Sequence, residues 1–381
     1  MSLNRMSKLI VLTLLLVLAL TSLSVLNAQD EWTNATEDMV DGTVIEGPRE
    51  AGPLPEGCAA PEAKDSYLIG FAQANSAEPW RTAMNDQLQA AVDSLNAEMA
   101  ESGGPTFELV IADAAQDNAK QVADIGNFLT QEVDLLITSP NEASPLTEAV
   151  NAAWEACVPV ILLDRNITNT DYTMFIGANN VSIGQSAGEY VAEYCAEMGL
   201  DPCNVFELHG LSGTSAAVDR SEGFMAGIEG STATIAVTQN ADWLRERAVT
   251  VANDVLQANP DIHVIYGHND PMAEGGYLAA ENLGLDMDSI LFVGVDALPT
   301  ADGGIVSVMQ GRLGATFIYP TGGQQAIDWA KMILIDHINP PLWVELPFGG
   351  VFEDTAQDVC NTYACPLAEE AADMEATEEA S

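Results

Sequence analysis

The chain has 381 residues, of which 48% are hydrophobic, enough to build the cores of two domains of ordinary size. It carries 57 acidic and only 12 basic residues, which gives a formal net charge of −45. Nucleic acids and anionic membrane surfaces are bound through Lys and Arg, so this charge excludes a nucleic-acid-binding protein.

The two ends of the chain differ in composition from the middle. A basic start, the apolar run 9–20 and a small residue at Ala28 are typical of a secretory signal peptide over 1–28. An uncleaved anchor is the alternative, although the run is short for a membrane span. Segments 29–65 and 367–381 are predicted to be a solvated acidic linker and an acidic tail.

Six cysteines in an exported chain favour disulfides, although six cysteines allow fifteen pairings. Short spacing favours Cys195–Cys203 and Cys360–Cys365, which leaves Cys58 with Cys157. The CxxC-type spacing of zinc sites is absent, and no metal site is expected.

From residue 66 onward, apolar strands alternate with amphipathic helices. In the first series the predicted strands are 67–73, 107–113, 133–139 and 159–165, and the predicted helices are 80–99, 119–131 and 143–157. Alternation of this kind is typical of a right-handed parallel sheet. The run PVILL ahead of Asp164 suits a strand that is buried on both faces.

A second series with the same pattern follows. Its predicted strands are 173–179, 204–210, 233–239, 263–269, 290–296 and 313–319, and its predicted helices are 183–197, 216–228, 245–259, 273–283 and 323–338. The chain is therefore expected to be an α/β protein with two doubly wound parallel-sheet lobes in tandem.

Nucleotide enzymes share this architecture, but their motifs are missing. No GxGxxG follows the first strand, and no GxxxxGK[ST] or GxSxG occurs. The turn GLSGTS (210–215) lacks a phosphate-binding lysine, and Ser/Thr capping of a helix explains it. The four histidines show no ligand spacing. No catalytic residue and no cofactor is predicted.

Polar and aromatic side chains follow the ends of the predicted strands. They are Trp80, Arg81, Asp164 and Arg165 in the first half, and Arg220, Trp243, Asn269, Asp296 and Tyr319 in the second. Ligands of open α/β sheets bind at this edge. A sugar suits such a set, because its hydroxyls need fixed donors and acceptors and its C–H faces favour aromatic rings.

Each of these residues also has a purely structural interpretation. The dipeptide Asp164-Arg165 is compatible with a helix cap or a surface ion pair, and Arg220 with a structural ion pair. Trp80 and Trp243 are compatible with core filling. Their occurrence at successive strand ends favours one ligand site, in which adjacent Arg and Asp side chains bind neighbouring hydroxyls.

Five segments carry a resemblance to a known family. They are GFAQANSAEPWR, PVILLDRNI, FELHGLSGTSAAVDRSEGF, GHNDPMAEGGYLAA and FVGVDA. In this order they resemble the ribose/galactose-type periplasmic sugar-binding proteins of ABC importers, from about residue 66 to 338. The pairing of Trp80-Arg81 with PCNVFELHG and AVDR is most similar to the galactofuranose-binding branch.

The resemblance implies the type I periplasmic binding protein fold, in which a three-strand hinge joins two lobes. It divides the chain into an N-terminal lobe of 66–171 plus 320–339 and a C-terminal lobe of 172–319 plus 340–366. One monosaccharide would lie between them, with Trp80 and Trp243 against its faces.

The resemblance also implies roles for polar residues. Asp164 and Arg165 would bind sugar hydroxyls from the first lobe, and Arg220, Asn269 and Asp296 from the second. Two residues depart from ribose binders, which have asparagine at Glu78 and glutamine at Tyr319; both put ribose itself in doubt. Asp113 and Asn141 end other strands and are weaker candidates that would equally suit helix caps.

The expected protein is a monomeric solute-binding protein, periplasmic or outside a single-membrane cell, that serves an ABC permease and its ATPase. Sugar-responsive repressors have the same lobes but carry a basic helix-turn-helix in place of this signal and acidic segment. Two alternatives stay open. An exported carbohydrate-active enzyme would need a pair of carboxylates, which this acidic chain could supply. A receptor would report the sugar to a signalling partner.

Overall fold

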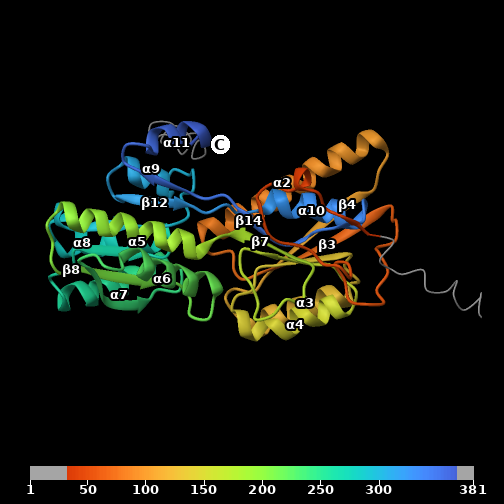
Figure 1. Ribbon diagram of the computed structural model, residues 1–381, viewed down its shortest axis with the longest axis horizontal. Helices are drawn as coiled ribbons and strands as arrows, with labels where there is room; N and C mark the ends of the chain where they lie inside the picture. Colours follow the sequence, from red (N-terminus) through yellow and green to blue (C-terminus); the bar gives the residue numbers. More distant parts are fainter. Residues whose placement is uncertain (1–31, 367–381) are drawn as a thin grey trace, which may run out of the picture.

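Two α/β lobes lie side by side along the long axis of the molecule in the computed structural model, which describes residues 32–366 (Figure 1). The signal peptide predicted for 1–28 and the acidic tail predicted for 367–381 lie outside the described residues. Within the described part of the chain, no helix is both long and apolar enough to cross a membrane.

The first lobe is built on a seven-stranded sheet in the order β2-β14-β7-β6-β5-β3-β4, which is parallel except for β2. Its strands are β2 (Thr43–Pro48), β3 (Ser66–Gln73), β4 (Thr106–Asp113), β5 (Leu135–Thr138), β6 (Val160–Leu163), β7 (Met174–Ala178) and β14 (Pro341–Leu346). Helices α2 (Pro79–Ser102) and α10 (Gly323–Leu334) cover one face, and α3 (Asn118–Thr130) and α4 (Ala143–Glu155) cover the other (Figure 1).

The apolar run of β6 explains why the strand lies in the middle of this sheet. Ile161 and Leu163 belong to the core under α2 and α10, whereas Val160 and Leu162 belong to the core under α3 and α4. Alternate residues of one strand thus fill both cores, as expected for a parallel strand covered on both faces.

The second lobe is built on a six-stranded sheet in the order β15-β12-β11-β10-β8-β9, parallel except for β15. Its strands are β8 (Cys203–His209), β9 (Ala233–Asn240), β10 (Val264–Gly267), β11 (Leu291–Val293), β12 (Ala315–Ile318) and β15 (Gly349–Phe352). Its helices are α5 (Asn180–Glu197), α6 (Ser215–Ile228), α7 (Arg245–Ala258), α8 (Asp270–Leu283), α9 (Gly304–Met309) and α11 (Ala356–Tyr363).

The chain crosses between the lobes three times, as the predicted three-strand hinge requires. The crossings lie between β7 and α5, between β12 and α10, and between β14 and β15. They run close together in the middle of the molecule (Figure 1). The expected α/β fold with two parallel-sheet lobes is confirmed.

The strands next to the crossings differ from the sequence-based assignment. The second series was expected to include 173–179, and 340–366 was assigned to the second lobe, but β7 and β14 both pair in the first sheet. The alternation of strands and helices does not change where the chain passes from one sheet to the other. The pattern therefore could not show which sheet each of these strands joins.

The prediction of a solvated linker over 29–65 is wrong for much of that segment. Residues 32–61, here called the strap, include β2, which pairs with β14, and β1 (Thr33–Asn34), which pairs with β13 (Ile338–Asn339). The Arg49 guanidinium lies 5.2 Å from the ring centroid of Trp154 and 5.8 Å from that of Tyr172. The short edge strand, which contains Val and Ile, was not predicted because the segment as a whole is acidic.

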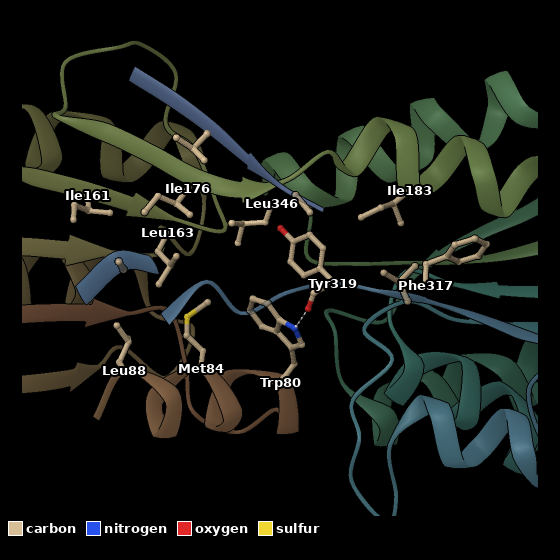
Figure 2. Close-up of a cluster of buried hydrophobic side chains, with 14 of the residues drawn as sticks. Trp80, Met84, Leu88, Ile161, Leu163, Ile176, Ile183, Phe317, Tyr319 and Leu346 are labelled. Carbon is tan, nitrogen blue, oxygen red and sulfur yellow. Dashed lines mark hydrogen bonds between the residues drawn. The ribbon is translucent and has the colours of Figure 1, made fainter. Parts of the chain in front are cut away.

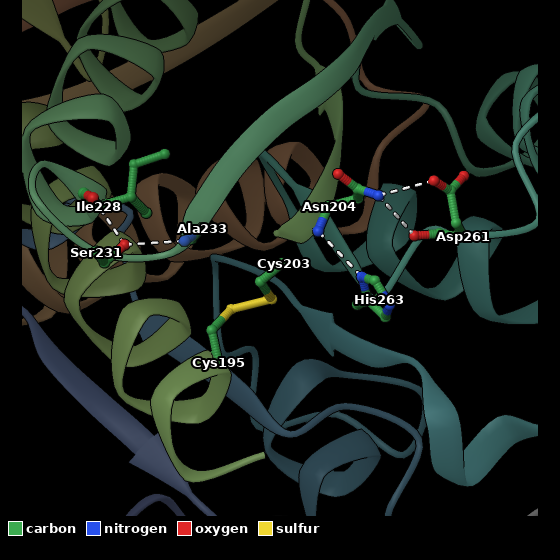
Figure 3. Close-up of a disulfide and its surroundings, with 8 residues drawn as sticks. All are labelled: Cys195, Cys203, Asn204, Ile228, Ser231, Ala233, Asp261 and His263. Carbon is green, nitrogen blue, oxygen red and sulfur yellow. Dashed lines mark hydrogen bonds between the residues drawn. A yellow bond between two sulfur atoms is a disulfide. The ribbon is translucent and has the colours of Figure 1, made fainter. Parts of the chain in front are cut away.

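Two of the three predicted disulfides are present. Cys58–Cys157 ties the strap to the end of α4, and Cys195–Cys203 joins the end of α5 to the start of β8 (Figure 3). The predicted Cys360–Cys365 bond is not formed, and both residues are buried free thiols. Short spacing in the sequence does not fix the directions of the Cα–Cβ bonds, which decide whether two sulfurs can meet.

Candidate functional site

A narrow cavity with about 20 Å³ of free volume lies between the lobes. Ten residues line it: Glu78, Trp80, Arg81, Asp164, Arg165, Ala216, Arg220, Trp243, Asp296 and Tyr319. The sequence singled out every one of them except Ala216. Side-chain exposure around the cavity is low, about 3% for Arg81 and Arg220, so the cleft is closed.

The fold explains why residues far apart in the sequence meet here. Asp164 and Arg165 directly follow β6, Asp296 follows β11, and Tyr319 follows β12 at the second crossing. Arg81 lies in the first turn of α2. The carboxyl ends of parallel strands in both sheets thus face one cleft, which is the usual ligand-binding edge of such sheets.

Asp164 is the most heavily bonded group in the cavity. Its carboxylate lies 2.6 Å from Arg81 Nη2 and accepts hydrogen bonds from the Tyr319 hydroxyl at 2.7 Å and the Ser139 hydroxyl at 3.1 Å. Arg165 Nε is farther away, at 3.7 Å. The adjacent residues Asp164 and Arg165 are therefore not each other's main partners, because Arg81 reaches the carboxylate from another element.

These contacts set the charge states in the first-lobe half. Burial alone would raise the pKa of Asp164, but the charges of Arg81 and Arg165 outweigh it and hold that pKa below its usual value. Burial, together with repulsion from Arg81, lowers the pKa of Arg165 to about 10, so Arg165 remains charged at neutral pH.

Trp243 lies between arginines of the two lobes. Its ring centroid is 5.4 Å from the Arg165 guanidinium and 5.6 Å from that of Arg220. The ring also packs on Gly210, where an added Cβ would stand 2.3 Å from it, so only glycine fits there. This packing fixes the indole as one wall of the cavity.

A buried polar pair, His268 and Glu207, lies next to Arg220, and the sequence analysis did not identify it. Arg220 donates to the His268 carbonyl, and the His268 ring lies 3.0 Å from Glu207. Burial lowers the pKa of His268 to about 4, so the ring is neutral at pH 7. Its Nδ1 accepts from the Gly210 N–H at 3.3 Å, which leaves Nε2–H to donate to Glu207.

Glu207 is held ionised by these neighbours. Its burial would raise its pKa, but hydrogen bonds from His268, Ser221 and Thr238 lower that pKa to about 2. Glu207 lies on the side of β8 that faces α6. The alternation of residues along a strand shows that this position is buried, but it does not show whether a carboxylate or an apolar residue is buried there. A glutamate inside a predicted buried strand, FELHG, was the available signal.

Asp296 differs from Asp164 in both partners and charge. Burial raises the pKa of Asp296 well above its usual value, and repulsion from Asp270 adds to the effect. Glu78 also has a raised pKa because of burial, which Arg81 and Arg165 partly offset. The cavity therefore combines an ionised carboxylate with carboxyl groups that hold protons more tightly.

Three buried donors on the cavity wall have no hydrogen-bond acceptor within residues 32–366. They are Arg81 Nε, Arg165 Nε and Trp243 Nε1. Buried donors are almost always satisfied in folded proteins, so unpaired ones beside a cavity indicate acceptors that a ligand would bring. Among the described residues, no cluster of His, Cys, Asp or Glu could hold a metal ion.

Trp80 belongs partly to the core as well as to the cavity. Its ring packs beside Met84 in the apolar cluster of the first lobe, and its Nε1 donates to the Tyr319 carbonyl at 2.8 Å (Figure 2). The ring centroids of Trp80 and Tyr319 are 5.1 Å apart. The core-filling interpretation of Trp80 and the ligand-facing one therefore hold together.

Three predicted residues do not line the cavity. Asn269 caps α8 and donates to the Trp243 carbonyl at 3.1 Å. The Asn141 side-chain amide donates to Asn118 Oδ1 at 2.8 Å, and the Asn141 backbone carbonyl accepts from Arg165 Nη1 at 3.2 Å. Asp113 is exposed and accepts from the backbone N–H of Ala115. In this structure Asn269 and Asn141 support cavity residues, whereas Asp113 caps a turn.

Comparisons with known proteins agree with this geometry. The ribose import binding protein RbsB of Salmonella typhimurium is 30% identical over 67% of this chain and 79% of its own length. The galactofuranose-binding protein YtfQ of Escherichia coli is 30% identical over 61% of this chain and 71% of its own. A solved fructose-binding periplasmic domain of a hybrid two-component system superposes with a TM-score of 0.71 at 33% identity, covering 82% of this chain and 98% of that one.

The model of the periplasmic binding protein domain family matches residues 69–336. This range contains all ten residues that line the cavity and two of the three crossings. The strap and the strands of the third crossing lie outside it. The chain therefore belongs to the periplasmic binding protein family.

Proposed function

We propose that the cleft binds one neutral monosaccharide, preferably as a furanose ring, and that the loaded protein delivers it to an ABC permease and its ATPase. Members of this family bind solutes outside the cytoplasm and are not enzymes. The ring form and the permease go beyond that membership.

The observation that carries the proposal is the set of unpaired donors on the cavity wall. Arg81 Nε, Arg165 Nε and Trp243 Nε1 are buried with no acceptor among residues 32–366. A sugar supplies several hydroxyl oxygens within a few ångströms, and an indole wall suits its C–H face. The lining side chains come from both lobes and are nearly all buried, which suits one small ring better than an oligosaccharide.

The charge balance favours a neutral sugar over a sugar acid or phosphate. The three guanidinium groups of Arg81, Arg165 and Arg220 face three acidic groups, Glu78, Asp164 and Asp296. Asp164 is ionised, and carboxyl groups of the wall already lie beside the guanidinium groups. An anionic ligand would therefore be repelled by Asp164 and would compete with these carboxyl groups for the same cations.

The preference for a furanose rests on sequence. The galactofuranose-binding relative has the same identity to this chain as the ribose-binding one, 30%. Glu78 and Tyr319 stand where ribose binders have asparagine and glutamine, and both residues line the cavity. On these two departures from the ribose binders, and not on the identities, we propose a sugar of the galactofuranose type.

Sensing is the second candidate function. The fructose-binding neighbour belongs to a hybrid two-component system, so the same fold at 33% identity serves a receptor. ATPase stimulation of a co-encoded permease, reconstituted in vesicles, is the outcome that supports import. A genetic neighbourhood with a sensor kinase and no permease would favour sensing.

A thermal-shift screen tests the ligand. Methyl β-D-galactofuranoside, D-fructose and D-ribose are compared with D-glucuronate as a charged control. A ligand at a hundred times its dissociation constant adds about 2.7 kcal/mol to the unfolding free energy. We expect the furanoside to raise the melting temperature most and glucuronate to leave it unchanged. No shift with any neutral sugar, or a larger shift with glucuronate, would overturn the proposal.

A further inference from the structure

Asn180 lies at the hinge and forms hydrogen bonds to two cavity residues, although it does not line the cavity itself. It is the first residue of α5, immediately after the first crossing, and only 5% of it is exposed. Its Oδ1 accepts a hydrogen bond from Arg220 Nε at 2.8 Å. Its Nδ2 donates to the Tyr319 hydroxyl at 3.3 Å.

Tyr319 continues this connection toward the first lobe. It follows β12 at the second crossing, and its hydroxyl donates to Asp164 Oδ1 at 2.7 Å. Its carbonyl accepts from Trp80 Nε1, as drawn in Figure 2. Burial raises the pKa of Tyr319, so the hydroxyl keeps its proton and acts as a donor to the ionised Asp164.

The result is one directed chain of hydrogen bonds, here called the relay: Arg220 to Asn180 to Tyr319 to Asp164. It begins on a cationic group of the second lobe and ends on an anionic group of the first. The Asn180 amide has only one orientation that fits, with its oxygen toward the guanidinium and its nitrogen toward the phenol. Hydrogen bonds in such a chain polarise and strengthen one another in a buried setting.

We propose that Asn180 is a positioning residue that orients Arg220 for the ligand and, through Tyr319, couples the two lobes in the closed state. The affinity part of this inference rests on the proposed sugar binding, whereas the coupling of the lobes does not. Arg220 and Asn180 both belong to the second lobe, so opening the cleft breaks the relay at its far end, between the Tyr319 hydroxyl and Asp164, and Asn180 helps to hold that hydroxyl in place. Asn180 thereby favours closure in the absence of a sugar as well as in its presence.

The neighbouring Asn179 provides a matched control. Its Oδ1 caps α5 by accepting from Ser182 N–H at 2.9 Å, and its Nδ2 donates to Glu345 of β14 at 3.0 Å. The two asparagines share a hinge position and a similar local role in starting α5. Only Asn180 contacts residues of the cavity wall.

The first test uses the sugar-free protein. Small-angle scattering compares the wild type with Asn180→Ala and Asn179→Ala. We expect a larger radius of gyration for Asn180→Ala, because loss of the relay shifts the population toward open forms, and a wild-type value for Asn179→Ala. Equal radii for the wild type and Asn180→Ala would overturn the proposal. This readout stands even if no monosaccharide binds the wild type, in which case only the proposed function fails.

The second test measures coupling with methyl β-D-galactofuranoside, or with D-ribose or D-fructose if only these shift the wild-type melting temperature. Titration calorimetry on Asn180→Ala, Tyr319→Phe and the double variant gives a double-mutant cycle. We expect Asn180→Ala to weaken binding about tenfold and Asn179→Ala less than threefold. The affinity of the double variant should be nearly the same as that of whichever single variant binds the sugar more weakly, since each change breaks the same relay. Fully multiplicative losses would overturn the proposal and leave Asn180 with a merely structural role.

Discussion

The first-lobe and second-lobe halves of the cleft hold their charged groups in different ways. Asp164 is bound by Arg81, Tyr319 and Ser139 within 3.1 Å. The Asp296 carboxyl group, across the cavity, accepts no hydrogen bond from any residue in the described range 32–366. The protein therefore pairs the carboxylate of the first half itself, whereas it leaves the Asp296 carboxyl group of the second half for the ligand.

This difference distinguishes groups that stabilise the fold from groups that contribute to ligand affinity. Groups that the protein has already paired contribute to the fold whether or not a ligand is present. Groups with unused hydrogen-bonding capacity add little to the sugar-free protein and become favourable when a ligand supplies partners. The pKa shifts of the two acids follow the same contrast: the charges of its arginine partners lower the pKa of Asp164, whereas burial raises the pKa of Asp296.

The largest expected effect is on stability, from Arg81→Met in the first half. It leaves Asp164 buried without its nearest cation, and breaking a buried ion pair costs about 3–5 kcal/mol. The urea midpoint of the sugar-free protein should fall accordingly. Arg247→Met is the control, because its pair with Asp242 at 3.0 Å is half exposed and worth under about 1 kcal/mol. Equal losses in the two variants would contradict the contrast between a paired and an exposed site.

Arg165→Ala should lower affinity more than stability. Among residues 32–366 its Nε has no hydrogen-bond acceptor, and its contact to Asp164 is long, at 3.7 Å, so Asp164 remains paired with Arg81. Loss of charge-assisted bonds to the sugar costs about 2–3 kcal/mol, so affinity should drop at least thirtyfold in titration calorimetry. The sugar-free melting temperature should fall less than in Arg81→Met. A large loss of stability with unchanged affinity would make Arg165 a structural residue.

Asp296→Asn should make the sugar-free protein more stable than the wild type, by an amount that increases as the pH rises. The folded-state pKa of Asp296 lies above its usual value, so the folded protein holds that proton more tightly than the unfolded chain. Stability from this group is present below about pH 4, the unfolded value, and is lost as the pH rises toward the folded pKa. The variant should therefore gain on the wild type in urea midpoints taken from pH 4 to 8. A constant difference over that range would refute the raised pKa.

The smallest expected effect comes from Trp243→Phe. The phenyl ring keeps an apolar wall between Arg165 and Arg220 but removes the unpaired Nε1 donor. Loss of one neutral hydrogen bond to the ligand costs about 0.5–1.5 kcal/mol, so affinity should fall roughly two- to twelvefold. The melting temperature of the sugar-free protein should fall modestly, because the smaller ring leaves part of the space against Gly210 empty. An unchanged affinity would show that the indole N–H does not contact the ligand.

Much of the cleft was predictable because strand ends are visible in the sequence. The buried run before Asp164 places Asp164 and Arg165 at a sheet edge, and the same reasoning applies to Asp296 and Tyr319. What the pattern cannot give is the direction of long side chains. Arg81 reaches Asp164 from a helix much earlier in the sequence, and only the packed structure decides that it lies closer than Arg165.

Other features were unpredictable for different reasons. Asn180 looks like an ordinary helix-start asparagine, and its role depends on two partners that the fold brings from distant segments. The strap was predicted to be a linker because average composition weighs its acidic residues more than the six residues of β2. The thiols of Cys360 and Cys365 were paired by spacing alone, which carries no information on geometry.

The pairing of β2 with β14 has a consequence for the order of folding. Residues 43–48 find their sheet partners only at 341–346, close to the end of the described chain. The strands β8 to β12 of the second lobe, by contrast, all lie between Cys203 and Ile318. Long-range pairing must overcome more loop-closure entropy and forms more slowly. Each sheet nevertheless takes one strand from the last part of the described chain, β14 in the first lobe and β15 in the second, so neither lobe can be completed until this segment has been made.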